Sequence, residues 1–249
     1  MRRPSRELVL AALLAAALGC QPSPAGLVQR ALETRGGLPR VRAIHSQRLT
    51  GRISFGSQVG TLRIEFKRPD QMRLEIGLPG GTLVRLFDGT SGWASDAATG
   101  HSQLLPMSAV ELAQARRDAD MDGPLVDSES KGIRISLAGQ GQLDGRPTED
   151  LDLVFRDGTV ERYHLDPATH EAVGWSETDV IDGKTEQRVS VVRSTKRMDG
   201  ILFPTSIEQS TSADRPAQHI LIERIELNPL LDDARFRPPT LGGAALPVR

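Results

Sequence analysis

The stretch Arg48–Lys67 decides the fold, and it reads RLTGRISFGSQVGTLRIEFK. Apolar side chains alternate with polar ones on both sides of a short turn at 56–58, as Leu49, Ile53 and Phe55 before it and as Leu62, Ile64 and Phe66 after it. A period of two places successive side chains on opposite faces of a strand. The stretch therefore predicts a β-hairpin with one apolar face and one polar face.

The same alternation continues along most of the chain. Further strands are predicted at 72–76, 82–87, 92–95, 102–105, 132–139, 149–155, 159–165, 171–180, 186–197, 203–209 and 218–227. Asp-Gly pairs, which favour tight hairpin turns, follow several of these segments, at 88–89, 157–158, 182–183 and 199–200. Strands do not alternate with long helices, so we expect an antiparallel meander and not a parallel sheet.

Two regions have a helical spacing of apolar residues instead. Between Leu27 and Ile44 they recur every three or four residues, with a break at Gly36-Gly37, and this pattern predicts two short helices. A third helix is predicted from Ser108 to about Arg117, because Ser108 is a good N-cap and Glu111 follows it by three residues.

The predicted strands have one apolar and one polar face, and only a few helices accompany them. Because the apolar face must be buried, this combination limits the fold class. We predict a mainly β (α+β) fold: a curved, antiparallel, incomplete β-barrel of about eleven strands with a few capping helices. Where the helices fill the opening only partly, such a barrel retains an apolar cavity. The side chains expected to line it are Leu49, Ile53, Leu62, Ile64, Phe66, Leu74, Leu86, Ile135 and Leu153.

The N-terminus is organised like an export signal. Three arginines precede an apolar run from Leu8 to Leu18 that is too short to span a bilayer. The sequence Ala17-Leu18-Gly19-Cys20 resembles a lipobox, which predicts cleavage of residues 1–19 and lipidation of Cys20. The alternative is a plain cleaved signal followed by an incidental cysteine.

Lipidation would fix both the location and the domain organisation. Several acyl chains hold a protein on a membrane almost permanently, and Gln21 stands where a retention signal would have Asp. We therefore expect a lipid anchor at the periplasmic face of the outer membrane. The predicted divisions are a signal peptide at 1–19, a lipidated tether at 20–26, one domain at 27–237 and a flexible tail at 238–249.

The composition excludes some functions. Loss of residues 1–19 removes three arginines and Glu7 from the 31 basic and 32 acidic residues, which leaves 28 and 31 and a net charge of −3. Without a clustered basic patch, nucleic-acid binding is not expected. Cys20 is the only cysteine, so a disulfide or a cysteine-based metal or redox site is excluded.

No arrangement of residues indicates an enzyme. The five histidines are scattered without carboxylates at a metal-ligand spacing, so neither a metal nor another cofactor is expected. Glu149, Asp150 and Asp152 are interpreted as a solvated strand edge, because neighbouring strand residues face opposite sides. No Gly-x-Ser-x-Gly elbow is present. Trp93 and Trp175 lie in predicted strands and are interpreted as core residues.

Several short motifs in a fixed order resemble one family. They are Arg35-Gly36-Gly37-Leu38, Lys67-Arg68-Pro69-Asp70-Gln71-Met72-Arg73-Leu74-Glu75, Phe87-Asp88-Gly89-Thr90-Ser91-Gly92-Trp93, Asp120-Met121-Asp122-Gly123-Pro124-Leu125-Val126-Asp127 and Tyr163-His164-Leu165-Asp166. Together they are similar to the outer-membrane lipoprotein-sorting proteins, the LolA/LolB-like group, over most of residues 27 to 237. The resemblance implies an unclosed barrel whose apolar cavity receives acyl chains of lipoproteins or lipids.

The resemblance also implies roles for particular residues. The membrane-anchored member of the group takes lipoproteins from a soluble periplasmic carrier, using an exposed apolar residue on the loop between its third and fourth strands. That loop corresponds to 77–81 here, and Leu78 is its bulky apolar residue; the alternative is that Leu78 only covers the barrel rim. The carriers use an arginine to lock a helical lid, and the sequence does not choose between Arg63 and Arg73 for it.

Three functions agree with these patterns. An outer-membrane receptor would bind acyl chains of lipoproteins or lipids in the cavity, and would serve lipoprotein sorting or localisation with a periplasmic carrier as partner. An envelope ligand sensor would use the same cavity to control another protein. A structural or interaction lipoprotein would have a packed interior and would take no part in transport.

Overall fold

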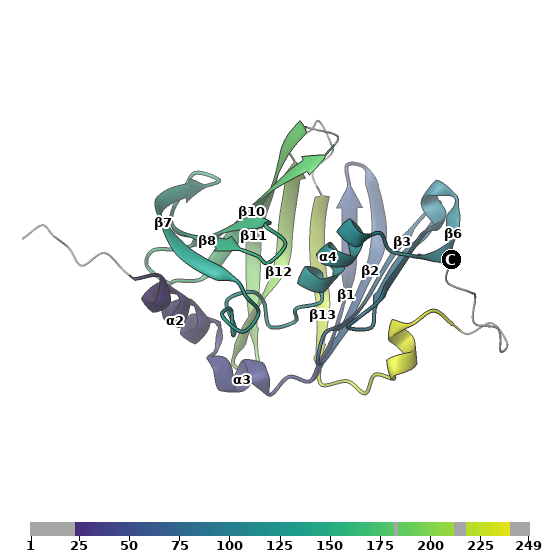
Figure 1. The fold of residues 1–249 in the computed structure, drawn as a ribbon, viewed down its shortest axis with the longest axis horizontal. Coiled ribbons are helices and arrows are strands. Elements are labelled where there is room, and N and C mark those ends of the chain that lie inside the picture. Colours follow the sequence, from purple (N-terminus) through teal and green to yellow (C-terminus); the bar gives the residue numbers. More distant parts are fainter. Residues whose placement is uncertain (1–22, 182–183, 212–217, 240–249) are drawn as a thin grey trace, which may run out of the picture.

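The computed structural model describes residues 23–181, 184–211 and 218–239. Its main feature is one sheet of thirteen strands in the order β6-β5-β4-β3-β2-β1-β13-β12-β11-β10-β9-β8-β7. Neighbouring strands are antiparallel throughout. The edge strands β6 and β7 do not pair with each other within these residues, and the sheet curves into an open barrel (Figure 1).

Each strand overlaps one of the segments predicted from alternation. The bounds are β1 Ser46–Phe55, β2 Gln58–Lys67, β3 Gln71–Leu78, β4 Gly81–Phe87, β5 Gly92–Asp96, β6 His101–Pro106, β7 Arg134–Leu143, β8 Arg146–Val154, β9 Val160–Leu165, β10 Ala172–Ile181, β11 Lys184–Met198, β12 Ile201–Thr211 and β13 Gln218–Leu227. The predicted incomplete barrel is therefore confirmed, with thirteen strands where about eleven were expected, because every short segment pairs into the same sheet.

Helices cover one end and the opening of the sheet. The first two are α2 Pro24–Arg35 and α3 Leu38–Arg42, separated at Gly36 and Gly37 as predicted. Helix α2 begins three residues before the expected Leu27, because the Ser23 hydroxyl accepts a hydrogen bond from the Gly26 N–H and caps it there. Two short 3₁₀ turns, η2 Ala97–Thr99 and η3 Asp233–Phe236, complete the described elements.

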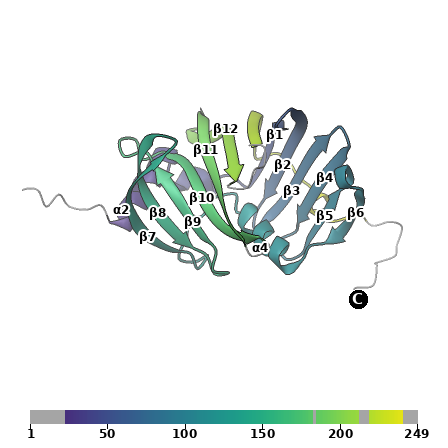
Figure 2. The ribbon, with the colours of Figure 1, turned by 90° about the horizontal axis from the view of Figure 1, so that it is seen from above.

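Helix α4 Ala109–Asp118 has the predicted capping box at its start. The Glu111 N–H donates to the Ser108 hydroxyl at 3.3 Å, and the Ser108 N–H donates to the Glu111 carboxylate at 2.8 Å. These two bonds satisfy donors that a helix otherwise leaves free at its first turn. Figure 2 shows α4 in the opening between the two halves of the sheet.

The two halves of the sheet meet at the β1–β13 pair. The register between these strands shifts at Thr50/Gly51, and a Cβ on Gly51 would lie 1.9 Å from the Leu221 carbonyl oxygen. Only glycine permits so close an approach of two backbones, and a bulge of this kind bends a strand. Gly51 therefore lets the first and last strands pair where the sheet curves.

The concave face carries separate apolar clusters and not one continuous core. One lies between the sheet and α2, around Leu27, Leu151, Leu153 and Leu165. A second lies on β1 to β4 and β13, around Ile53, Leu62, Ile76 and Ile222. A third joins Met72 and Phe87 to Ala115 and Ala119 of α4. Helices α2 and α4 thus cover different parts of one apolar face.

The convex face is crossed by the C-terminal segment, which is fixed by a buried carboxylate. The Glu65 side chain is 0% exposed, and it accepts hydrogen bonds from Arg48 at 2.8 Å and from Arg235 at 2.7 Å. Burial alone would raise the pKa of Glu65, but the hydrogen bonds from Arg235 and Arg48 outweigh it and lower the pKa. Phe236, the residue that follows Arg235, is also fully buried.

We expect Glu65→Gln to lower the free energy of unfolding by roughly 3 kcal/mol at neutral pH, because it breaks a buried ion pair and leaves two arginines without their carboxylate. The pKa of Glu65 is lower in the folded state, so this stabilisation is present above the pKa of an unfolded-chain glutamate and is lost as the pH falls through the folded value. Urea titrations at several pH values measure it.

The control is Glu223→Gln, which removes a solvent-exposed partner of Arg52 and should change stability by less than about 1 kcal/mol. Equal losses for Glu65→Gln and Glu223→Gln would show that burial of the Glu65 carboxylate does not matter.

Candidate functional site: an apolar cavity beneath helix α4

A cavity of about 920 Å³ lies between the concave face and α4. One wall is apolar and consists of alternate side chains of β1 to β3 and β13: Ile53, Leu62, Ile64, Phe66, Met72, Leu74, Ile76 and Ile220. On the other side, α4 lines the cavity with two alanines, Ala109 and Ala113, and with the larger side chains of Val110, Glu111, Gln114, Arg117 and Asp118.

The opposite wall is polar. It contains Arg117 and Asp118 of α4, Arg188 of β11 and the amides Gln209 and Gln218 at the ends of β12 and β13. The cavity therefore has one side suited to hydrocarbon and one side that binds polar groups, a common combination in small-molecule sites.

Arg117 joins α4 to the C-terminal half of the sheet. Its guanidinium forms an ion pair with Asp157, contacts a Glu177 carboxylate oxygen at 3.2 Å and lies 5.8 Å from the centre of the Phe155 ring. A guanidinium over an aromatic face gains a cation–π contact in addition to its ion pairs. These contacts fix the second half of α4 over the sheet.

Two carboxylates face each other beside this arginine. Glu161 of β9 is paired in register with Glu177 of β10, and like charges directly opposite each other are unfavourable. Burial raises the pKa of Glu161 to about 7, with a further contribution from Glu177 and an opposing one from Arg117. Burial also raises the pKa of Asp118. The Glu161 carboxyl, beside Glu177 and Arg117, therefore takes up a proton near pH 7.

The segment after α4 is tied to the sheet by Arg68, which follows β2. Its guanidinium donates to both carboxylate oxygens of Asp122, at 2.7 and 2.8 Å, and to the carbonyl oxygens of Ile44 and Val41, at 2.7 and 3.2 Å. Arg63 is instead exposed on β2. The sequence did not single out Arg68, although it stands in one of the motifs that carry the family resemblance.

Arg73 has a different role. It lies on the convex face, where it donates to Glu75 at 2.9 Å and to the Arg235 carbonyl oxygen at 2.8 Å. The sequence offered Arg63 and Arg73 as candidates for a lid-locking arginine. Among the described hydrogen bonds and ion pairs, neither of them contacts the α4 segment. Arg68 is the arginine that does so from the β2–β3 turn.

The structure brings together part of the predicted lining. Ile53, Leu62, Ile64, Phe66 and Leu74 all line the cavity beneath α4. Leu49 is on the same face, paired in register with Ile64, and packs in the apolar cluster next to the cavity without lining it. Trp175, which was interpreted as a core residue, lines the cavity from β10.

The prediction for Leu86 was wrong. Phe87, and not Leu86, is paired with Met72 and shares its concave face. Leu86 pairs with Arg73 and Trp93, so it lies on the opposite face, where it is fully buried. Two apolar residues follow each other at the end of β4, and alternation alone cannot decide which of them faces inward.

Leu153 and Ile135 lie away from the cavity. Leu153 is 0% exposed in the cluster that α2 covers. Ile135 lines a separate groove of about 900 Å³ between β7 and the N-terminal helices, together with Val28 and Leu32. Both face an apolar region as predicted, but α2 occupies that end of the sheet. The amphipathic pattern of α2 does not indicate which strands it covers.

Leu78 is the last residue of β3 and not a loop residue. It pairs in register with Gly81, and only Pro79 and Gly80 form the exposed turn. Its side chain is partly buried against the cluster that contains Ile76. This placement fits the view that Leu78 covers the barrel rim, and its part in lipoprotein transfer stays a prediction.

Asp150 was expected at a solvated edge, and that expectation was wrong. It is 4% exposed and lies 2.9 Å from Nδ1 of His164, whose Nε2 lies 3.1 Å from the Ser176 hydroxyl. A Cβ on Gly141 of β7 would lie 2.1 Å from an Asp150 carboxylate oxygen. The end of the β7–β8 hairpin therefore covers this polar cluster on the sheet, which no sequence pattern indicated.

The predicted lipidation site and tail are not tested by the structure. Cys20 and residues 240–249 lie outside the described residues. Within them, no helix is long and apolar enough to cross a membrane. The same residues contain no group of three or more His, Cys, Asp or Glu side chains placed to hold a metal ion.

Comparison with solved structures identifies the fold. A LolA superfamily protein from Nitrosomonas europaea matches 86% of this chain and 97% of its own, with a TM-score of 0.59 and 15% identity. A DUF1329 family protein from Desulfovibrio piger matches 88% and 98%, with a TM-score of 0.58 and 14% identity. The chain has the LolA/LolB-like fold.

A third structure with this LolA/LolB-like fold is a domain classed with the outer membrane lipoprotein-sorting proteins, from Vibrio parahaemolyticus. It matches 84% of this chain and 97% of its own, with a TM-score of 0.55 and 10% identity. No protein-family model and no curated protein matches the sequence significantly. At these identities the likeness shows the architecture, and function has to be argued from the cavity.

We expect Glu161→Gln to raise the melting temperature at pH 8 by a few degrees, because it removes a partly buried carboxylate that faces Glu177. The folded protein binds a proton at Glu161 up to about pH 7, whereas an unfolded glutamate releases it near pH 4.5. The wild type should therefore lose stability as the pH rises between these values, and the variant should lose less.

Thermal unfolding from pH 4 to pH 8 gives the comparison, with Glu129→Gln on the exposed surface as control. The same pH slope for the wild type and Glu161→Gln would contradict the assignment of the proton to Glu161.

Proposed function

We propose that this protein binds an acyl chain of a lipid or a lipidated protein in the cavity beneath α4. The observation that carries the proposal is the open, apolar wall of β1 to β3 and β13, which lines a cavity beneath α4. The volume, about 920 Å³, lies in the range of roughly 300–1,000 Å³ typical of ligand sites. A purely structural lipoprotein would be expected to fill this space.

The chemistry of the wall favours hydrocarbon. Each methylene transferred from water to an apolar site contributes about 0.8 kcal/mol. An acyl chain that buries ten methylenes would therefore gain roughly 8 kcal/mol before the cost of immobilising the chain is subtracted.

The proposed cellular role is the localisation of lipoproteins at the outer membrane. Lipidation at Cys20 would hold the cavity close to the periplasmic face of that membrane, where a soluble periplasmic carrier could hand over its cargo. The LolA superfamily and lipoprotein-sorting folds of the similar structures support this role. An anchored ligand sensor would use the same cavity but would change the activity of a partner protein when the cavity is filled.

Filling the cavity tests acyl-chain binding. We expect Leu74→Trp to weaken binding of a fluorescent fatty acid at least tenfold, because the larger side chain occupies the apolar wall. Val84→Trp is the matched control, since Val84 is also partly buried but lies on the convex face, in register with Glu75. Fluorescence titration, together with native mass spectrometry for co-purified lipid, gives the result.

Unchanged fatty-acid affinity in a folded Leu74→Trp protein would show that the acyl chain does not bind in the cavity beneath α4. Equal losses in Leu74→Trp and Val84→Trp would attribute the effect to folding and would also count against it. Consistent absence of both co-purified lipid and fatty-acid binding in the wild type would overturn the function.

Anchorage is tested separately. We expect the full chain to incorporate a palmitate analogue and to sediment with outer membranes, and we expect Cys20→Ala to do neither, because the thiol is the acceptor of the lipid. Metabolic labelling and density-gradient fractionation measure the two effects. Labelling that persists in Cys20→Ala would contradict the predicted lipobox.

A further inference from the structure

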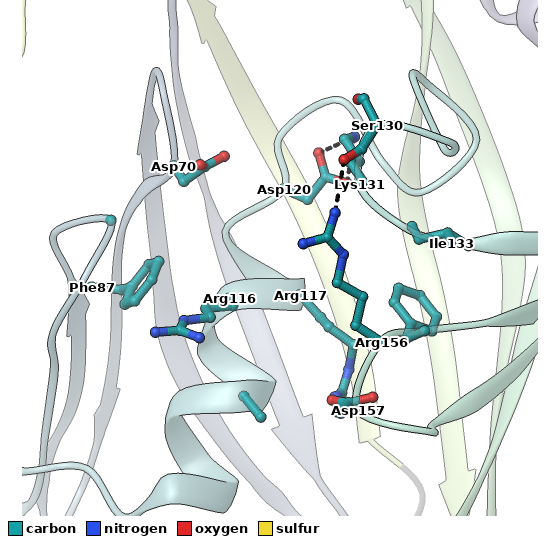
Figure 3. A pocket seen from close by; sticks show the side chains of 13 residues that line it. Asp70, Phe87, Arg116, Arg117, Asp120, Ser130, Lys131, Ile133, Arg156 and Asp157 are labelled. Atoms are coloured by element: carbon teal, nitrogen blue, oxygen red, sulfur yellow. Dashed lines mark hydrogen bonds and ion pairs between the residues drawn. The ribbon is translucent and has the colours of Figure 1, made fainter.

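A second cavity, of about 430 Å³, adjoins the acyl cavity at α4. The two have Ala113, Arg117 and Asp157 in common. The second cavity is completed by residues of the β2–β3 turn, the end of β4, the loop at 130–133 and the β8–β9 turn (Figure 3). The two cavities are therefore neighbours with part of their lining in common.

This second cavity is rich in cations. Arg116, Arg117, Lys131 and Arg156 line it, against the carboxylates of Asp70, Asp120 and Asp157. Two of the cations are used within the protein. Lys131 donates to both carboxylate oxygens of Asp120 at 2.7 Å, and Arg117 pairs with Asp157 and Glu177.

Among the described residues, the side chains of the other two cations have no carboxylate partner. The Arg156 guanidinium donates to the Ser130 carbonyl oxygen at 3.0 Å, and the Arg116 guanidinium makes no hydrogen bond or ion pair to a described residue. Both side chains are exposed. In Figure 3 Arg116 comes from α4 and points toward Phe87, whereas Arg156 comes from the β8–β9 turn and points toward Ser130. Two exposed guanidiniums at one cavity, neither with a carboxylate partner among the described residues, are suited to an anion.

The remaining walls are apolar. Phe87, Phe155, Ile133 and Ala113 line the same cavity. A site for a small, fully hydrated anion would not need aromatic walls. Apolar walls beside arginines that have no carboxylate partner among the described residues suit a molecule in which a charged group is joined to hydrocarbon.

We propose that this second cavity binds the anionic head group, a phosphate ester, of a lipid whose acyl chain occupies the first cavity. Arg116 and Arg156 hold the phosphate oxygens, and Phe87 and Phe155 contact the adjoining glycerol and first methylenes. The proposal rests on the acyl-binding function proposed above and narrows its ligand to anionic amphiphiles. In this arrangement α4 lies between the head group and the acyl chain.

The test compares two lipids with the same chain. Palmitoyl lysophosphatidylglycerol carries a phosphate, and monopalmitoylglycerol does not. Both are titrated by displacement of a fluorescent fatty acid from the mature chain with Cys20→Ser, which retains all described residues. The double variant Arg116→Gln/Arg156→Gln is compared with Arg63→Gln/Arg146→Gln, which removes two exposed arginines from other parts of the sheet.

We expect Arg116→Gln/Arg156→Gln to weaken binding of the phospholipid by roughly five- to tenfold, a moderate effect because both arginines are exposed. Binding of monopalmitoylglycerol should change less than about twofold, since its chain contacts only the first cavity. The control variant should bind both lipids as the wild type does. Added salt should weaken only the phospholipid.

Three results would overturn the head-group site. Equal affinity of the wild type for both lipids would show that the phosphate adds nothing. Equal losses of phospholipid affinity in both double variants would show that overall charge, and not Arg116 and Arg156 in particular, causes the effect. If neither lipid binds the wild type, the acyl-binding function itself fails and the head-group site with it.

Discussion

The ion pair between Arg68 and Asp122 holds together parts of the chain that are far apart in sequence. Arg68 stands between β2 and β3, and its remaining donors bind the carbonyl oxygens of Val41 and Ile44 at the end of the N-terminal helices. Asp122 stands in the segment that leads from α4 to β7. The pair is partly buried, so its loss would leave charges and carbonyl groups unsatisfied in a low-dielectric setting. The position of α4 over the sheet depends on it.

The cavity is a consequence of how α4 is held. Arg117 and Asp122 fix the second half of the helix and the segment after it, and Ala115 and Ala119 allow close contact with Met72 and Phe87. Over the rest of the apolar wall, the helix faces Leu, Ile and Phe side chains across the cavity, with Ala109 and Ala113 among its lining residues. Helix and sheet are not closely packed at this place, which leaves room for a ligand.

Alternation and turn chemistry were sufficient to predict the strands, the antiparallel sheet and the capped start of α4, because these depend on neighbouring residues. They were not sufficient for choices that depend on partners far along the chain. Leu86 and Phe87 are equally apolar, and only the register with Met72 directs Phe87 inward. Leu153 faces the concave side, but α2 covers it. Asp150 is buried by the hairpin of its own strand, with His164 as partner. Arg68 differs from the many other arginines only in its contacts with Val41, Ile44 and Asp122, which are distant in the sequence.

The open barrel has a consequence for the protein's behaviour in a crowded compartment. Within the described part of the chain, strands β6 and β7 each leave one row of backbone groups without a strand partner, and such edges invite pairing with other chains. β6 is only six residues long and ends at Pro106, which cannot donate a backbone hydrogen bond. β7 is interrupted by a bulge between Leu137 and Gly139, and it carries Arg134 and several glutamines and glycines. Both edges of the open barrel thus carry features that oppose aggregation.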